Sequence, residues 1–382
     1  MTPGRRALES LLGEAIGPVD RADLFLVRLP FVAPFAISTA VWTTKDALLL
    51  RLEAGGLTAW GECVADPDPF YASETTVTAR HVLKDFLVPL LEPGLALGEL
   101  DRRMRRVRGH EMAKATLENA LLDLIAKRRR VPLHALLGAP RKKVMSGISI
   151  GLQDSPAALV AAVEAAVGKK YHRVKMKIRK GQDVEYVRAV RERFPGLPLM
   201  ADANGDYRLD DAEHLARLDA FDLMMIEQPL SYDDVYFHSI LQKSLRTPIC
   251  LDESIHGLDD AAAAIALGGC RILNLKQGRV GGLMESMRIL GHAAEKGIPV
   301  WSGGMDETGI GRAVNIHLQA LDGFTLPGDT SETSRYFHED LVEPPVVLDA
   351  EGFIEIPRGD GIGVAVVPER LERRKLSEER LF

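Results

Sequence analysis

The chain has 382 residues, enough for two or three domains, although one α/β barrel would take up roughly 250 of them. Hydrophobic residues make up 46% and charged residues 27% of the chain, which excludes a disordered or fibrous protein and indicates a large core. The net charge of −6 argues against a nucleic-acid partner, because such a protein is expected to carry a basic domain.

The cysteines and the N-terminus set the expected compartment. Cys63, Cys250 and Cys270 are widely spaced and form no CxxC pattern, so neither a disulfide framework nor a thiolate metal site is indicated. The first residues are too weakly apolar for a signal peptide, and no segment approaches 18 consecutive apolar residues. We therefore expect a cytoplasmic protein with no membrane span.

The N-terminal third has the order of an α+β domain. Residues 1–21 read as an extension, either an extra helix or a frayed segment. Strand-like runs then come first (LFLVRL, ALLLRLEA, TAWGEC) and helical runs follow (SETTVTARHVLKDFL, ATLENALLDLIAKR). This order predicts a separate capping domain over residues 22–140.

After residue 140 short apolar runs alternate with amphipathic helices at intervals of about 25 residues. Ser155 followed by Pro156 marks the start of one such helix. Eight runs read as strands: 146–150, 173–178, 197–202, 223–227, 248–252, 271–276, 298–302 and 323–326. They predict a (β/α)7β barrel of the TIM type over residues 141–340, with an open doubly wound sheet as the alternative. Residues 341–382 return to strand-and-turn texture and are expected to pack back on the capping domain.

Three carboxylates stand at the ends of consecutive predicted barrel strands, Asp202, Glu227 and Asp252, each 25 residues from the next. One acidic residue at such a place is usually a helix N-cap, but three in register are hard to explain in that way. Neighbouring strands lie about 4.8 Å apart, so the side chains can converge above the sheet. An all-oxygen site without histidine or cysteine suits Mg²⁺ or Mn²⁺.

Three lysines complete the strand-end pattern. Lys175 and Lys177 are two residues apart on one strand and face the same side, while Lys276 ends the strand four positions around the ring. Repulsion, burial and a nearby cation should lower the pKa values of Lys175 and Lys177 toward that of a usable base. A carboxylate substrate between Lys177 and Lys276 would have one amine on each face of its α-carbon, an arrangement suited to moving an α-proton through an enediolate.

These motifs resemble one known group. The segments VKMKI, ADAN, IEQPL, CLDES, LNLKQGRVGG and WSGGMDETGIGR, with LVRLPFVAPF, WGECVA and LPGDTSE, are similar to the enolase superfamily, in its muconate-lactonizing subgroup. That superfamily's lysine base and Mg²⁺ are a known example of pKa tuning. The resemblance runs from about residue 22 to 370 and is strongest to the N-acylamino acid racemase and o-succinylbenzoate synthase family.

The resemblance implies a role for each matching residue. It makes Lys177 and Lys276 the acid/base pair, and Asp202, Glu227 and Asp252 the ligands of Mg²⁺, for which Mn²⁺ or another divalent cation could substitute. The substrate contacts would come from Lys175, Asn204, Ser149, Gly303, Gly304 and Met305. The segment Pro30 to Trp42 would form a lid that excludes water.

Three positions depart from the family pattern. Asp306 stands where an apolar residue is usual, Gln277 replaces a proline, and the lid reads ISTAV where relatives often have an aromatic residue. Asp306 could point into the substrate pocket and repel a succinyl carboxylate, or it could cap the next helix. We expect the cap.

The resemblance leaves two reactions open. One is racemisation of N-acylated, in particular N-succinylated, amino acids by two-base proton transfer. The other is dehydration of a hydroxycyclohexadiene carboxylate to o-succinylbenzoate for menaquinone synthesis. Dipeptide epimerisation, muconate cycloisomerisation and a non-catalytic metal-binding scaffold are weaker alternatives. The expected partners are a small-molecule carboxylate substrate and further copies of the chain, as an octamer or dimer.

Overall fold

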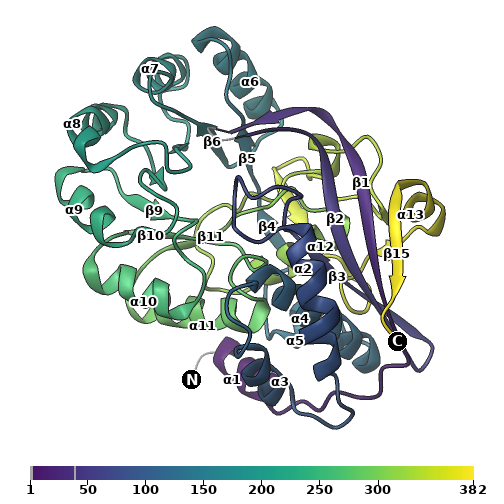
Figure 1. Ribbon diagram of the computed structural model, residues 1–382. Coiled ribbons are helices and arrows are strands. Elements are labelled where there is room, and N and C mark those ends of the chain that lie inside the picture. The colour runs from purple at the N-terminus through teal and green to yellow at the C-terminus, as the bar shows by residue number, and fades with distance from the viewer. Residues whose placement is uncertain (1–2, 38–39) are drawn as a thin grey trace.

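A computed structural model describes residues 3–37 and 40–382 (Figure 1). An antiparallel sheet near the N-terminus has the strand order β15-β1-β2-β3. Its strands are β1 (Arg21–Ala36), β2 (Val41–Ala54), β3 (Leu57–Cys63) and β15 (Lys375–Arg380). The C-terminal strand β15 pairs antiparallel with β1, so a segment from the end of the chain forms one edge of this sheet.

Helix α4 (Glu111–Arg129) packs on β3 and β2 of this sheet, and α2 (Thr76–Val82) contacts β2. The other helices of this region are α1 (Pro3–Leu12), α3 (Leu97–Met104) and α5 (Leu133–Leu136), and α13 (Pro368–Arg374) precedes β15. The contact between α4 and β3 is close, because a Cβ on Gly61 would lie 2.0 Å from the carbonyl oxygen of Thr116. A glycine at this position therefore allows the helix to rest directly on the strand.

The second region is a parallel sheet wound into a barrel, with the strand order β11-β10-β9-β8-β7-β6-β5. Its strands are β5 (Gly147–Ile150), β6 (Arg173–Lys177), β7 (Leu199–Asp202), β8 (Ile226–Glu227), β9 (Ile249–Leu251), β10 (Ile272–Leu275) and β11 (Val300–Ser302). The predicted α/β class, a (β/α)7β barrel with an N-terminal α+β domain, is confirmed.

The eighth strand differs from its prediction. Residues 323–326 form no regular strand; single bridges join Phe324 to Val300 and Gly328 to Ser146. The amide of Asp329 also donates to the carbonyl of Ser302 at 2.8 Å. The ring is thus closed by an irregular extended segment, and this segment brings Asp329 to the carboxyl end of the barrel.

Helices surround the barrel in the order of the chain, on its outer side in Figure 1. They are α6 (Pro156–Gly168), α7 (Val184–Arg193), α8 (Ala212–Leu215), α9 (Tyr236–Ser244), α10 (Leu258–Leu267), α11 (Leu283–Glu295) and α12 (Gly309–Gln319). Ser155 is the N-cap of α6, as predicted, and its side chain accepts a hydrogen bond from the amide of Ala158. Two small ribbons complete the fold: β4 (Lys143–Met145) with β13 (Phe353–Glu355), and β12 (Val342–Glu343) with β14 (Ala365–Val366).

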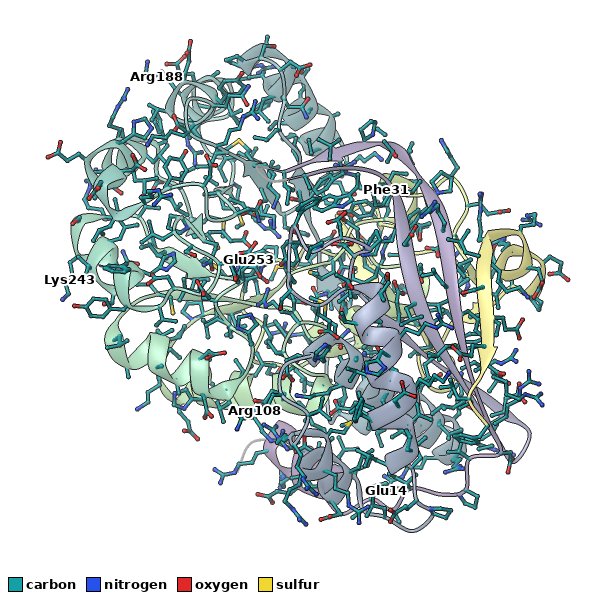
Figure 2. All side chains as sticks on the ribbon, in the orientation of Figure 1. Glu14, Phe31, Arg108, Arg188, Lys243 and Glu253 are labelled. Carbon is teal, nitrogen blue, oxygen red and sulfur yellow. The ribbon has the colours of Figure 1, made fainter. Side chains whose placement is uncertain are left out.

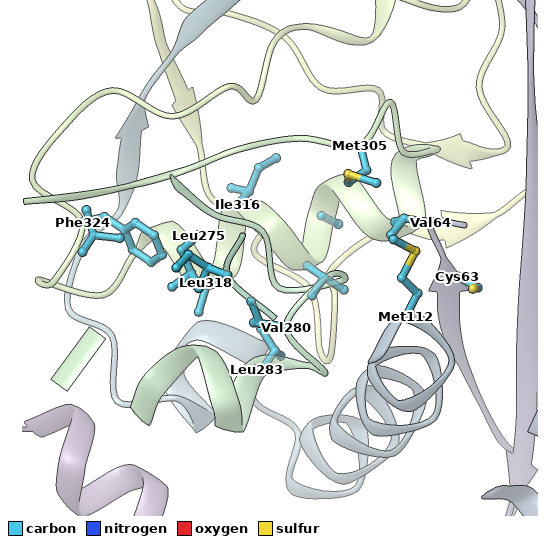
Figure 3. Packing of buried hydrophobic residues seen from close by; sticks show 14 of the residues in the cluster. Cys63, Val64, Met112, Leu275, Val280, Leu283, Met305, Ile316, Leu318 and Phe324 are labelled. Atoms are coloured by element: carbon cyan, nitrogen blue, oxygen red, sulfur yellow. The ribbon is translucent and has the colours of Figure 1, made fainter. Parts of the chain in front are cut away.

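The two regions meet along an apolar seam. Val64, just after β3, lies beside Met112 of α4 and Met305 of the loop after β11 (Figure 3). A Cβ on Gly278 would lie 2.6 Å from the Val64 side chain, so the loop after β10 touches the N-terminal region directly. Charged residues such as Arg188 and Lys243 are exposed on the outside of the barrel (Figure 2), whereas Glu253, just after β9, is buried. None of the helices in the described residues is long and apolar enough to cross a membrane.

Candidate active site

The carboxyl ends of five neighbouring barrel strands carry the charged residues singled out from the sequence. Asp202 and Glu227 are the last residues of β7 and β8, and Asp252 directly follows β9. All three side chains are fully buried. Parallel strands end at the same edge of the barrel, and side chains there converge on the mouth.

The β6 lysines lie on the same side of their strand, and both meet these carboxylates. Lys175 Nζ lies 3.1 Å from Asp202, 3.2 Å from Glu227 and 2.9 Å from Asp329. Lys177 Nζ donates to Asp202 Oδ2 at 2.7 Å and to Asn204 Oδ1 at 2.6 Å. Asn204, which has a left-handed backbone, also donates to Glu253 at 2.8 Å, and this bond fixes the orientation of its amide.

Lys276, just after β10, approaches from the other side of the ring, with β7, β8 and β9 between it and β6. Its Nζ donates to Asp252 Oδ2 and to the hydroxyl of Tyr71, both at 2.8 Å. Arg279 donates to the other oxygen of Asp252 and to the carbonyl of Asn274. Lys177 thus pairs with Asp202, whereas Lys276 pairs with Asp252.

Burial and ion pairing act in opposite directions on these groups. Burial alone would lower the pKa of Lys175, but Asp329, Glu227 and Asp202 outweigh it and raise that pKa well above its usual range. Burial likewise lowers the pKa of Lys276, but Asp252, with Tyr71 and Glu253, outweighs it and raises that pKa well above its usual range. The expectation of a lowered pKa for the strand lysines is therefore wrong for Lys175 in this arrangement. That expectation rested on repulsion between the two lysines, on burial and on a nearby cation, whereas three carboxylates act directly on the amine.

The three carboxylates are the kind of ligand that binds a divalent cation, but their side chains are not arranged around one common position. In the described part of the chain, no three histidine, cysteine or acidic side chains are arranged to hold a metal ion as they stand. Glu227 Oε2 is buried, and its partner among the described residues is the Lys175 ammonium at 3.2 Å. Burial and the neighbouring Asp202 raise the pKa of Glu227 well above its usual range. Three buried carboxylates fit a hard cation, provided that they turn from their lysine partners toward it.

A cavity opens above these residues. About 630 Å³ inside it is not filled by protein atoms, and part of this space is open to solvent. Lys175, Lys177 and Lys276 line it together, as do three of the predicted substrate contacts, Ser149, Gly304 and Met305. Asn204 also lines the cavity, whereas Gly303 packs beneath it: a Cβ there would lie 2.7 Å from the Lys276 side chain.

The predicted lid includes the end of β1 and the start of β2, which pair as a hairpin. Phe31, Phe35, Ile37 and Trp42 line the cavity, and Leu152 donates to the carbonyl of Ala36 at 3.0 Å, which ties the hairpin to the barrel (Figure 2 labels Phe31). Residues 38–39 of the predicted lid lie outside the described residues. The aromatic side chains that the segment ISTAV lacks are therefore supplied from either side of it.

Two of the residues that depart from the family pattern, Asp306 and Gln277, lie in different places. The expectation that Asp306 caps the next helix is wrong: Thr308 is the N-cap of α12, and its side chain accepts from the amide of Ile310. Asp306 instead lines the cavity. Gln277 is buried away from it and accepts a hydrogen bond from Asn119 of α4 at 2.9 Å, so it joins the two regions.

Several residues of the site were missed from the sequence. Asp329 stands in the quoted segment LPGDTSE but follows an irregular strand, and Tyr71 lies in a capping-domain loop without any periodic pattern. Lys45 and Asp66 also line the cavity and form an ion pair of 3.0 Å. A polar residue just after a predicted barrel strand was the signal available for Asp329; the other residues had none.

Comparisons with known proteins place this geometry in context. Residues 21–138 match the N-terminal domain of mandelate racemase and muconate lactonizing enzyme, and residues 158–370 match the family described as enolase C-terminal domain-like. The o-succinylbenzoate synthase of Geobacillus kaustophilus is 47% identical over 91% of this chain and 93% of its own length. The N-succinylamino acid racemase of an Amycolatopsis species is 44% identical over 92% and 95%. An enolase superfamily protein from Listeria innocua, of known crystal structure, has a TM-score of 0.91 at 40% identity, covering 95% of this chain and 98% of its own.

Proposed function

Because the chain is an enzyme of the enolase superfamily, in the family of the o-succinylbenzoate synthases and N-succinylamino acid racemases, we propose that it racemises N-acylated amino acids. The reaction would be a two-base proton transfer at the α-carbon. The observation that carries this proposal is the placement of Lys177 and Lys276, which line one cavity from β6 and from the end of β10, with three strands between them.

Asp202, Glu227 and Asp252 would hold a divalent cation, with Mg²⁺ the best match to their oxygen donors. When bound, the ion supplies positive charge that stabilises the substrate carboxylate as negative charge builds up on it. To face the cation, Asp202 and Asp252 would turn away from their lysine partners. Lys177 would then be released from Asp202, and Lys276 from Asp252. Each amine could then turn toward the α-carbon.

The other residues would bind and orient the substrate. Lys175 would face the substrate carboxylate, because its amine lies among the carboxylates and lines the cavity. For one enantiomer Lys177 would remove the α-proton and Lys276 would deliver a proton to the opposite face, and for the other enantiomer the roles would be exchanged. Tyr71 and Asn204 would hold the two amines in position between turnovers. The aromatic hairpin would keep water from the carbanion.

The test is proton NMR of N-succinyl-L-phenylalanine in D₂O with the protein and Mg²⁺, with polarimetry on the same sample. Loss of the α-proton signal together with decay of the optical rotation is the expected result. Exchange with retained rotation would mean that one lysine alone delivers protons, and would contradict two-base racemisation. Absence of exchange with any N-acylamino acid would reject the reaction class.

The second candidate is o-succinylbenzoate synthesis, which is favoured by the name of the relative at 47% identity. That elimination needs one lysine to move a proton, while the other only stabilises charge as an ammonium. Lys276→Arg keeps a positive charge beside Asp252 but removes a usable acid/base group. We expect this variant to lose racemisation and to retain part of any synthase activity. Equal loss of both activities would contradict this division of roles.

A further inference from the structure

One wall of the cavity carries charge that the proposed reaction does not use. Lys45 of β2 and Asp66, which follows β3, come from the capping domain, and Asp306 comes from the loop after β11. We call these three residues the cap-side wall. Burial raises the pKa of the Asp306 carboxyl, and Lys45, Glu307 and Asp66 are the charges that act on it most strongly. The cap-side wall is therefore a group of interacting charges distinct from the strand-end lysines and carboxylates.

The cap-side wall has more negative than positive charge. Lys45 is buried, and its amine donates to Asp66 at 3.0 Å and to the carbonyl of Val64 at 3.1 Å. The Asp306 carboxylate has no hydrogen bond, and no ion pair within 4.0 Å, among residues 3–37 and 40–382. Arg335 adds a weaker attraction, but its guanidinium lies over the rings of Phe35 and Tyr336. One ammonium thus faces two carboxylates, and one of these is free to meet a ligand.

The position of Asp306 is set before any ligand arrives. Its backbone has a φ of 55°, a left-handed conformation that aspartate and asparagine tolerate better than most residues. Two residues later, the amide and hydroxyl of Thr308 both donate to the buried Glu62 of β3, at 2.9 and 2.6 Å. A carboxylate held in this way presents its charge to the cavity without a cost of rearrangement on binding.

We propose that Asp306 sets the charge preference of the cap-side wall, which accepts a cationic group of the substrate and rejects an anionic one. The inference rests on the proposed function for the class of ligand, an N-acylamino acid. The cation would be an ammonium or guanidinium, either at the end of the acyl group or on the amino-acid side chain. A terminal acyl carboxylate, as in a succinyl group, would face a like charge in a partly buried cavity, where such a contact weakens binding by about tenfold or more.

The test measures binding, so it does not depend on turnover. Two matched pairs of ligands are titrated by calorimetry at pH 8 with Mg²⁺. N-succinyl-L-phenylalanine and N-(4-aminobutanoyl)-L-phenylalanine differ in charge at the acyl end; N-acetyl-L-glutamate and N-acetyl-L-lysine differ on the side chain. We expect the cationic member of one pair to bind about tenfold more tightly, and the pair that responds identifies the end that meets Asp306.

Asp306→Asn removes the charge, and asparagine tolerates the left-handed backbone, so this variant should reduce that preference by about tenfold. Asp306→Gly, which the positive φ also favours, is the second variant if the first does not fold. Asp322→Asn is the matched control, because it changes the net charge equally at an exposed residue paired with Arg141. An unchanged preference in Asp306→Asn, or no binding of any of the four ligands, would overturn the inference. A charge preference without α-proton exchange would instead reject the proposed racemisation alone.

Discussion

Two sets of buried carboxylates occupy this molecule and have different partners. The strand-end set, Asp202, Glu227 and Asp252, faces the side-chain amines of the cavity. The seam set, Glu62 and Glu118, faces backbone amides at the first turns of two barrel helices. Glu62 accepts from Thr308 and Gly311 at the start of α12, and Glu118 accepts from Met284 at the start of α11.

The difference shows that a buried charge alone does not mark a catalytic group. A helix N-terminus is a fixed positive pole, so a seam carboxylate is held in one place and joins the capping domain to the barrel. A lysine amine can turn, so a strand-end carboxylate can exchange it for a cation or for a substrate. Whether a buried carboxylate has a structural or a catalytic role therefore depends on its partner, a backbone amide or a lysine amine.

The largest effect is expected at Lys177. Lys177→Met keeps most of the length of the side chain and removes the amine, and Lys175 still lies 3.1 Å from Asp202, so the fold should persist. Loss of a general base lowers kcat by about 10³-fold, measured as racemisation of the best N-acylamino acid. Lys243→Met, on the exposed side of α9, is the control and should keep full activity. Similar losses in both variants would point to damage outside the cavity.

The seam set should respond to pH in a direction that can be worked out. Burial raises the pKa of Glu62 to about 7, despite the three hydrogen bonds that it accepts. Between about pH 4.5 and 7 the folded chain then holds a proton that the unfolded chain has released. The contribution to the free energy of unfolding is thus present below this window and is lost as pH rises through it, by on the order of 3 kcal/mol.

Urea titrations at pH 5, 6, 7 and 8 check this slope. Glu62→Gln cannot titrate, so its free energy of unfolding should fall less than that of the wild type between pH 5 and 7. Other ionisable groups contribute alike to both proteins and cancel in the difference. Parallel pH profiles for the two proteins would show that Glu62 does not hold the extra proton.

The strand-end set should respond to a divalent cation. At a Mg²⁺ concentration of 100 Kd, binding to the folded state alone stabilises it by about 2.7 kcal/mol. Glu227→Gln should abolish the increase in melting temperature, because it removes one of the three carboxylates. Glu118→Gln should keep the increase, although its starting stability differs. Loss of the Mg²⁺ response in both variants would contradict the separation of the two sets.

A site residue can be predicted from the sequence when the pattern that marks it lies in the residues next to it in the chain. Asp202, Glu227 and Asp252 each close an apolar run, so the position of one carboxylate and the spacing to the next are both visible in the chain. The barrel follows from the same repeat. The structure places these residues at one edge of the sheet, as the repeat predicts.

Contacts between distant segments left no such signal. Tyr71 reaches Lys276 from a loop of the capping domain, and Asp329 follows a segment that closes the ring through single bridges. Asp306 was expected at a helix N-cap because aspartate is common there, yet Thr308 stands nearer to the first turn and its hydroxyl takes that place. A tertiary contact decided each of these positions.

The smallest effect is expected at Ser155, an ordinary helix N-cap that serves as a reference for the seam carboxylates. Ser155 caps α6 with a neutral hydroxyl on the outside of the barrel, at 3.2 Å from the amide of Ala158. Ser155→Ala should lower the free energy of unfolding by about 1 kcal/mol, the usual cost of a lost N-cap, and the loss should be the same at pH 5 and pH 8. Urea titrations at both values measure it. Because a hydroxyl does not titrate in this range, any pH dependence of the Ser155→Ala loss would mean that the slope assigned to Glu62 also has other sources.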